Sequence, residues 1–213
     1  MRRPEFIVVA GPNGAGKSTL CSYYIQCTSF DGDLLATKLR LEHPDWPDRW
    51  IIGSVATMLE KQKSQSISNR ENFAFETNFS TELILNMIEE FKKSDYKISL
   101  YYFGIDTLDD SMYRVEQRVV CGGHNVPEEI VKFNFYESIK NVNKYLNLFD
   151  SITFIDGYSK YGDVIALYIK KSEKLEITKT DCNWFNDYFK ESFEKLKMKA
   201  TEQKVSKRPR FKL

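Results

Sequence analysis

The stretch Gly11-Pro12-Asn13-Gly14-Ala15-Gly16-Lys17-Ser18-Thr19 decides the fold, because it matches the phosphate-binding pattern G-x-x-x-x-G-K-[ST] at every fixed position. The apolar run Phe6–Ala10 before it predicts a buried strand, and the residues from Thr19 onward predict a helix. Glycines let backbone N–H groups turn inward around an anion, and a helix that begins there adds the positive end of its dipole. The context therefore predicts a nucleotide-phosphate loop from Gly11 to Thr19.

Two side chains of this loop carry chemistry. Lys17 can reach the β- and γ-phosphates of a bound nucleotide, and the Ser18 hydroxyl can ligate Mg²⁺. The expected cofactors are therefore Mg²⁺ and a nucleoside triphosphate, and the loop leaves ATP and GTP both open. The alternative is a glycine-rich turn without a ligand, which the strand–loop–helix context disfavours.

Length and composition describe an ordinary globular chain. Its 213 residues, with 42% hydrophobic and 29% charged residues, are typical of one α/β domain rather than of a disordered or membrane protein. No apolar run approaches the roughly 18 residues that cross a bilayer. The N-terminus leads into the first strand without a signal-peptide pattern. We therefore expect a cytoplasmic protein with no membrane partner.

Charge is unevenly distributed along the chain. The net charge is +1, but residues 190–213 hold nine Lys/Arg and three Asp/Glu, a balance of +6 (9 − 3) that leaves −5 (1 − 6) for the rest. We expect residues 1–203 to form a single domain and residues 204–213 a basic, disordered tail. Contact with nucleic acid is expected only through this tail, because the rest of the chain is acidic overall.

Strands and helices are expected to alternate, which predicts an α/β fold with a mainly parallel sheet covered by helices on both faces. The expected strands are residues 5–10, a short strand ending near residue 30, 73–76, 96–105 and 151–156, followed by a possible hairpin of 164–169 and 175–178. The expected helices are residues 19–27, 34–41, 49–66, 81–93, 108–120, 127–148 and 184–199. Because ligands bind at the carboxyl ends of parallel strands, Gly11, Asp31, Asp33, Glu76 and Asp156 are expected to face one crevice.

Asp33 is the predicted catalytic base. It follows the second strand, where an acceptor hydroxyl could lie opposite the γ-phosphate, and an ionised carboxylate can accept the hydroxyl proton. The same residue is well placed as the N-cap of the following helix, and it could serve both roles.

The neighbouring strand ends predict a metal site and an acceptor pocket. Asp31 could hold a water on Mg²⁺, so the predicted metal site is Ser18 with Asp31, and Asp31 also faces the acceptor. Glu76 ends the third strand and could hydrogen-bond the acceptor. Thr77 and Asn78 follow it and are predicted to form the floor of the substrate pocket.

A helix with two arginines is a predicted lid. Arg114 and Arg118 are spaced i,i+4, so both guanidinium groups project from one helix face, ahead of Gly122-Gly123. Such a helix can close onto the phosphates. The alternative is a solvated face with an ion pair through Glu116.

These residues together resemble the zeta-toxin family of P-loop kinases, in particular its compact single-domain branch, over about residues 5–160. The resemblance rests on six segments in order: Ala10–Thr19, Asp31–Ala36, Phe73–Ser80, Arg114–Val119, Gly122–Pro127 and Asp156–Ser159. The phosphate loop alone is generic. The Phe-Glu-Thr block followed by Arg-Val-x-x-Arg-Val and Gly-Gly-His-x-Val-Pro is specific.

The resemblance implies an ATP- or GTP-dependent kinase that phosphorylates a hydroxyl of a small, nucleotide-linked sugar, which is UDP-N-acetylglucosamine for the best-known members. It assigns the family's base to Asp33, its substrate-binding glutamate to Glu76 and its lid arginines to Arg114 and Arg118. His124, in the Gly-Gly-His segment, is expected to contact the substrate. An antitoxin that blocks the nucleotide site is the implied protein partner.

The chain also departs from the family pattern. Members often carry Asn where Asp31 stands, and an Arg-rich run where this chain has Lys132-Phe133-Asn134-Phe135-Tyr136. The stripe Lys132, Tyr136, Lys140 and Lys144 supplies cationic charge, but Lys is a point donor and cannot replace the bidentate fork of Arg. Altered substrate choice or slowed chemistry follows as a hypothesis.

Two other functions stay open at this point. The basic tail and the abundant aromatic residues would suit a nucleic-acid-end kinase or a nucleic-acid-binding NTPase. The missing arginines would suit a degenerate nucleotide-binding domain that acts through a protein partner. Intact Lys17, Ser18, Asp33 and Glu76 oppose the degenerate domain.

Overall fold

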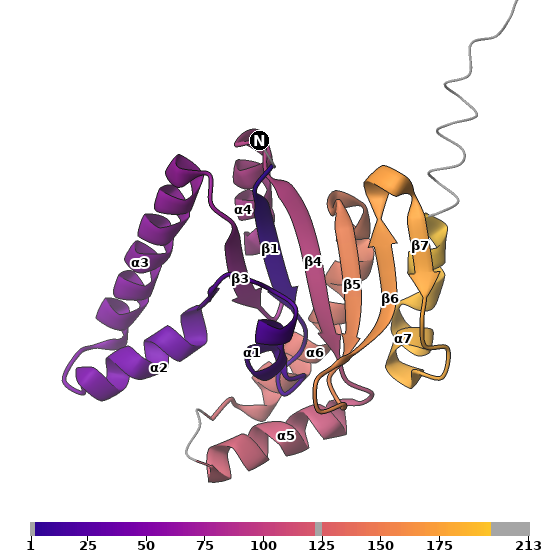
Figure 1. The fold of residues 1–213 in the computed structure, drawn as a ribbon. Helices are drawn as coiled ribbons and strands as arrows, with labels where there is room; N and C mark the ends of the chain where they lie inside the picture. The colour runs from indigo at the N-terminus through magenta and orange to yellow at the C-terminus, as the bar shows by residue number, and fades with distance from the viewer. Residues whose placement is uncertain (1–2, 122–124, 197–213) are drawn as a thin grey trace, which may run out of the picture.

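The computed structural model describes residues 3–121 and 125–196 and shows a seven-stranded sheet flanked by helices (Figure 1). The strand order is β2-β3-β1-β4-β5-β6-β7. The strands are β1 (Glu5–Ala10), β2 (Ser29–Asp31), β3 (Phe73–Thr77), β4 (Lys97–Gly104), β5 (Ser151–Asp156), β6 (Asp163–Ile169) and β7 (Lys174–Ile177). Strands β1 to β5 pair in parallel, and β6 and β7 are antiparallel. The predicted α/β fold and the C-terminal hairpin are confirmed.

The helices are α1 (Lys17–Leu20), α2 (Gly32–Glu42), α3 (Asp48–Asn69), α4 (Leu83–Lys93), α5 (Leu108–Val120), α6 (Glu128–Tyr145) and α7 (Asn183–Tyr188), with single 3₁₀ turns η1 (Cys21–Tyr23), η2 (Leu146–Leu148) and η3 (Lys170–Ser172). After α7 a turn at Phe189 precedes a further helical stretch, 190–196. Among the described residues, no helix is long and apolar enough to cross a membrane.

The prediction of a long helix after the phosphate loop is wrong. α1 has four residues and gives way to the 3₁₀ turn η1. The Cys-Ser-Tyr-Tyr run at residues 21–24 has lower helix propensity than Leu or Ala, so the sequence does little to extend α1. Because so few peptide dipoles are aligned, the loop's own N–H groups and Lys17 must supply most of the attraction for an anion.

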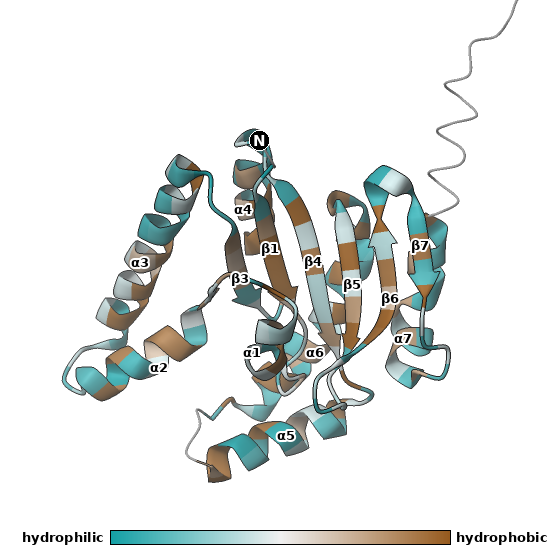
Figure 2. Ribbon diagram, viewed as in Figure 1, coloured by the Kyte–Doolittle hydropathy of each residue, from teal (hydrophilic) through white to brown (hydrophobic). Residues whose placement is uncertain are grey.

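The side chains of β1 alternate between the two faces of the sheet and contribute to an apolar core on each face. Phe6, Val8 and Ala10 belong to the larger apolar cluster, which also takes side chains from α4, α6 and α7. Ile7 and Val9 belong to the smaller cluster, which is packed beneath α1 and η1. Figure 2 shows β1 in brown, the hydrophobic colour, along most of its length. The strand that leads into the phosphate loop is therefore buried on both faces.

The strand register brings three strand ends together. Asp31 of β2 lies beside Glu76 of β3, and Glu76 lies beside Val9 of β1. In Figure 1 the arrowheads of β1 and β3 point to the end of the sheet where α1 and α5 lie. The phosphate loop, which follows β1, therefore leaves the sheet next to two carboxylates.

Candidate nucleotide and acceptor site

A cavity of about 730 Å³ lies at the carboxyl ends of β1, β2 and β3. It brings together thirteen of the residues predicted from the sequence: Asn13, Gly14, Gly16, Lys17, Ser18, Thr19, Asp31, Asp33, Glu76, Thr77, Asn78, Arg114 and Arg118. Its wall also includes residues that the sequence did not suggest, Leu34, Thr37, Phe75, Ser80 and Val126 among them. The predicted His124 and the Gly122-Gly123 pair lie outside the described residues, as does the basic tail.

Lys17 is buried inside its own loop. Its Nζ donates hydrogen bonds to the carbonyl oxygens of Gly11 at 2.8 Å and Pro12 at 3.0 Å, and to Asn78 Oδ1 at 3.0 Å. Burial lowers the pKa of Lys17, and the negative charge of Glu76 opposes this shift. Asn78, which the sequence predicts on the floor of the acceptor pocket, thus also contacts the phosphate-binding lysine.

Ser18 faces two carboxylates. Its Oγ donates to Glu76 Oε1 at 2.8 Å and lies 3.5 Å from Asp31 Oδ2. Burial raises the pKa of Glu76, Lys17 opposes the shift, and Asp31 adds to it. A hydroxyl and two carboxylates are hard oxygen donors of the kind that Mg²⁺ prefers.

This donor set fits Mg²⁺ with the phosphates of a substrate. In the described part of the chain, no group of three or more His, Cys, Asp or Glu side chains could hold an ion by itself. Mg²⁺ usually binds through one or two carboxylates and completes its shell with water and phosphate oxygens. Ser18 and Asp31 were predicted from the sequence, whereas Glu76 was assigned to the acceptor alone. Its place beside Ser18 comes from the parallel pairing of β2, β3 and β1.

Asp31, not Asp33, caps helix α2, so this part of the prediction is wrong. Asp31 has an extended backbone at the end of β2, and its carboxylate accepts a hydrogen bond from the Leu34 N–H at 3.0 Å. Asp33 lies in the first turn of α2, is exposed and lines the cavity. Since Asp31 caps the helix, the Asp33 carboxylate remains on the cavity wall.

Arg114 is held against the phosphate loop. Its Nη1 donates to the carbonyl oxygens of Gly14 at 3.1 Å and Gly157 at 2.9 Å, and its guanidinium lies 4.5 Å from the centre of the Tyr158 ring. Gly14 has φ +75°, and a Cβ at this position would meet Arg114 Cβ at 2.9 Å. Helix α5 therefore packs closely on the loop through Arg114, whereas Arg118, one turn later, is exposed and also lines the cavity.

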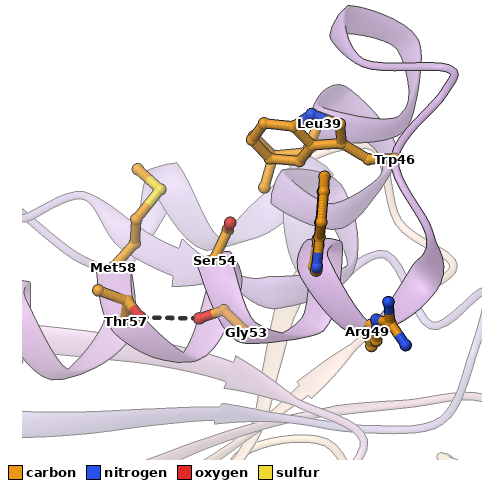
Figure 3. A pocket seen from close by; sticks show the side chains of 8 residues that line it. Leu39, Trp46, Arg49, Gly53, Ser54, Thr57 and Met58 are labelled. Atoms are coloured by element: carbon orange, nitrogen blue, oxygen red, sulfur yellow. Dashed lines mark hydrogen bonds between the residues drawn. The ribbon is translucent and has the colours of Figure 1, made fainter.

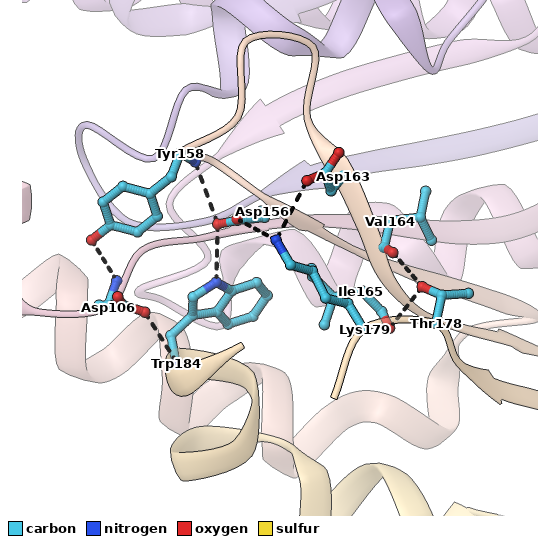
Figure 4. Close-up of polar contacts among 9 residues, drawn as sticks. All are labelled: Asp106, Asp156, Tyr158, Asp163, Val164, Ile165, Thr178, Lys179 and Trp184. Atoms are coloured by element: carbon cyan, nitrogen blue, oxygen red, sulfur yellow. Dashed lines mark hydrogen bonds and ion pairs between the residues drawn. The ribbon is translucent and has the colours of Figure 1, made fainter. Parts of the chain in front are cut away.

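Asp156 does not line the cavity, contrary to the prediction from strand ends. Figure 4 shows its carboxylate between elements of the C-terminal region. It accepts from Trp184 Nε1 at 3.4 Å and from the Tyr158 N–H at 3.3 Å, and it lies 3.8 Å from Lys179 Nζ. These partners come from later in the chain and give Asp156 a structural role.

The segment 132–136, noted for its missing arginines, contributes a different contact. Asn134 is buried and its Nδ2 donates to Asn13 Oδ1 in the phosphate loop at 2.8 Å. The cationic stripe lies elsewhere, because Lys140 pairs with Glu137, Lys144 pairs with Glu82, and no member of the stripe lines the cavity. The lysines of α6 therefore do not substitute for arginines in this pocket.

A second cavity of about 660 Å³ lies between α2 and α3 (Figure 3). Its lining is mostly apolar and includes Leu39, Trp46, Trp50 and Met58. It shares no lining residue with the cavity beside the phosphate loop. It therefore belongs to a separate surface of the molecule.

Comparisons with known proteins agree with this geometry. A family model described as Zeta toxin matches residues 1–173. The chain belongs to the zeta toxin family. It has the fold and the phosphate loop of a P-loop kinase. An uncharacterized protein of Haemophilus influenzae is 28% identical over 135 residues, which are 61% of this chain and 91% of that protein.

Solved structures share the fold of this zeta toxin family member. The structure of the PezAT chromosomal toxin–antitoxin system of Streptococcus pneumoniae matches with a TM-score of 0.60 at 16% identity, over 97% of this chain and 89% of that chain. A complex of AvrRxo1-ORF1 and -ORF2 with ATP matches with a TM-score of 0.66 at 12% identity, over 87% of this chain. The present chain spans only 63% of that chain's length. At these identities the likeness shows the fold alone.

Proposed function

We propose that this protein transfers the γ-phosphate of ATP or GTP to a hydroxyl of a small, nucleotide-linked sugar such as UDP-N-acetylglucosamine. The observation that carries the proposal is one cavity lined both by the phosphate loop and by Asp31, Asp33 and Glu76, with Ser18 Oγ hydrogen-bonded to Glu76 Oε1 at 2.8 Å. Phosphoryl transfer needs little covalent chemistry from a protein, so positioning and charge neutralisation in such a cavity are the main requirements.

The donor half of the reaction uses the loop and its neighbours. The triphosphate would lie along the N–H groups of Gly11 to Thr19, with Lys17 at the β- and γ-phosphates. Ser18, Asp31 and Glu76 would hold Mg²⁺, which when bound neutralises charge on the phosphate oxygens. Arg118 lines the same cavity, one turn after Arg114 on α5, and its guanidinium would approach the phosphates.

The acceptor half relies on Asp33. The acceptor oxygen forms a bond to the γ-phosphorus as the bond from that phosphorus to the β–γ bridging oxygen breaks, and the nucleoside diphosphate leaves. The hydroxyl proton passes to the Asp33 carboxylate. Thr77 and Asn78 line the cavity beside Glu76, where their polar side chains can hydrogen-bond a sugar.

The family supports the substrate class and a possible antitoxin partner. A cavity of about 730 Å³ is within the range of pockets that hold small-molecule ligands. An antitoxin would act by covering the nucleotide site.

Mass spectrometry tests the substrate. Wild-type protein is incubated with ATP, Mg²⁺ and UDP-N-acetylglucosamine, and UDP alone serves as the control acceptor. The expected result is a mass gain of one phosphate on the nucleotide sugar only. If neither compound is phosphorylated but another metabolite from an extract is, the assignment of a nucleotide sugar as acceptor is overturned, whereas the assignment of kinase activity stands. The absence of any phosphorylated product from a nucleotide-binding protein would overturn both.

A further inference from the structure

Helix α6 carries an unusual set of buried polar side chains. Of its six buried residues, Val131, Phe135 and Val142 are apolar, whereas Asn134, Ser138 and Asn141 are polar. A buried amide costs free energy unless it is hydrogen-bonded, and an apolar side chain of similar shape is often as stable or more so. The partners of these amides therefore indicate what the polar stripe does.

The two asparagines reach opposite halves of the proposed site. Asn134 Nδ2 donates to Asn13 Oδ1, within the phosphate loop, at 2.8 Å. Asn141 Nδ2 donates to the carbonyl oxygen of Phe79 at 3.1 Å, directly after the acceptor segment Glu76–Asn78. The two amides are seven residues apart, which is about 10.5 Å along a helix axis. One rigid helix thus contacts both the donor loop and the acceptor segment.

The Phe79 end of this connection is under backbone strain. Phe79 has φ +54°, a left-handed conformation that a bulky residue rarely adopts. Its N–H donates to Thr77 Oγ1 at 2.9 Å, its carbonyl accepts from Asn141, and its ring is buried. The turn fixed in this way directs Asn78 back to the phosphate loop, where its Oδ1 accepts from Lys17 Nζ at 3.0 Å.

We propose that Asn134 and Asn141 are positioning residues, and that α6 sets the spacing between the phosphate donor and the acceptor pocket. Neither side chain is assigned to touch substrate. Asn134 holds the loop through Asn13, and Asn141 holds the turn that carries Asn78. The proposal rests on the phosphotransferase function above, since in-line transfer requires donor and acceptor to be held close to the reactive geometry.

The test compares Asn134→Leu and Asn141→Leu with Ser138→Ala. Ser138 is a matched control, because it lies between the two on the same stripe, is fully buried, and its Oγ is 3.4 Å from Tyr102 Oη in the core rather than from the site. We expect either asparagine variant to lower kcat by about 10- to 100-fold, since a 1 Å misplacement can cost about 10²-fold. The ATP dissociation constant and the acceptor KM should change less than about threefold. The control should keep wild-type kcat.

Hydrogen exchange gives a second readout that does not depend on transfer. In the wild type, ATP bound at the loop should slow exchange of the amides of residues 77–80, and Asn141→Leu should weaken that response while Ser138→Ala keeps it. Loss of this coupling in a protein that transfers no phosphate would support the positioning role and refute the proposed reaction. Wild-type kcat and wild-type coupling in both asparagine variants would overturn the positioning role. If a leucine variant does not fold, the Asn→Ser variants, whose hydroxyls are too short to reach the partners, carry the same expectations.

Discussion

Replacing Arg114 by Met separates two roles for this side chain. The sequence predicts a lid arginine that acts on bound phosphates, whereas in the structure the guanidinium donates to the carbonyl oxygens of Gly14 and Gly157. Hydrogen bonds from a charged donor contribute about 1.5–3 kcal/mol each, and the lower value suits a half-buried group, so the two bonds amount to about 3 kcal/mol. The contact with the Tyr158 ring adds about 0.5–1 kcal/mol.

The assay is thermal unfolding in the absence of nucleotide. For a chain of this size, 1 kcal/mol shifts Tm by about 2–4 °C, so the total of about 3.5–4 kcal/mol predicts that Arg114→Met lowers Tm by roughly 7–16 °C. Arg118→Met is the comparison, because this exposed side chain lines the same cavity; it should shift Tm by less than about 2 °C, as exposed positions usually do. A Tm of Arg114→Met within 2 °C of wild type, with transfer abolished, would refute the structural role of Arg114 at the phosphate loop. Arg114 would then act on the bound phosphates, as the sequence predicts.

Further predictions concern the carboxylates and one glycine. Burial raises the pKa of Glu76, so the native state loses stability as the pH rises through that pKa. Glu76→Gln should therefore raise Tm at pH 7.5 and give no gain in Tm below about pH 4, where glutamate is ordinarily protonated. The same variant should lower kcat. Asp156→Asn should keep wild-type kcat and lower the free energy of unfolding by at most about 1 kcal/mol in denaturant, since its ion pair with Lys179 is partly exposed. A tenfold loss of kcat would show instead that Asp156 acts in the nucleotide and acceptor site. Gly14→Ala should abolish ATP binding in a calorimetric titration, because its φ of +75° and the nearby Arg114 leave no room for a Cβ; retained affinity would contradict the tight packing of α5.

The phosphate loop was predictable because its chemistry is local. Nine consecutive residues specify the turn, the lysine and the hydroxyl, and the apolar run before them specifies the strand. The carboxylates Asp31 and Glu76 were predictable as a group, since parallel strands end at the same edge of a sheet. Which of them meets Ser18 depends on strand order and register, and these are long-range properties.

Two of the errors concern acidic residues at strand ends, whose partners the local sequence does not identify. Asp31-Gly32-Asp33 offers two possible caps for α2, and only the extended backbone at the end of β2 selects Asp31. Asp156 ends β5, as Asp31 ends β2, but Lys179 and Trp184, which follow much later in the chain, contact it. No local pattern carries that information.

Asn134 was overlooked because the segment was compared with an arginine-rich pattern. A signal was present in the helix itself, since Val131, Asn134, Phe135 and Ser138 follow the i, i+3, i+4, i+7 spacing of a buried face. A polar residue on that face predicts a hydrogen-bonded partner inside the molecule. The identity of the partner, Asn13, requires the packing of α6 against the loop.

The most direct test of the account is the Asp33→Asn variant with γ-labelled ATP, Mg²⁺ and UDP-N-acetylglucosamine, measured beside the wild type for both nucleotide binding and transfer. The side chain keeps its shape but can no longer accept the hydroxyl proton. We predict ATP affinity within about threefold of wild type and a fall in transfer of about 10²- to 10⁴-fold, the usual contribution of a general base. Transfer at the wild-type rate by Asp33→Asn would contradict the central claim that this carboxylate activates the acceptor.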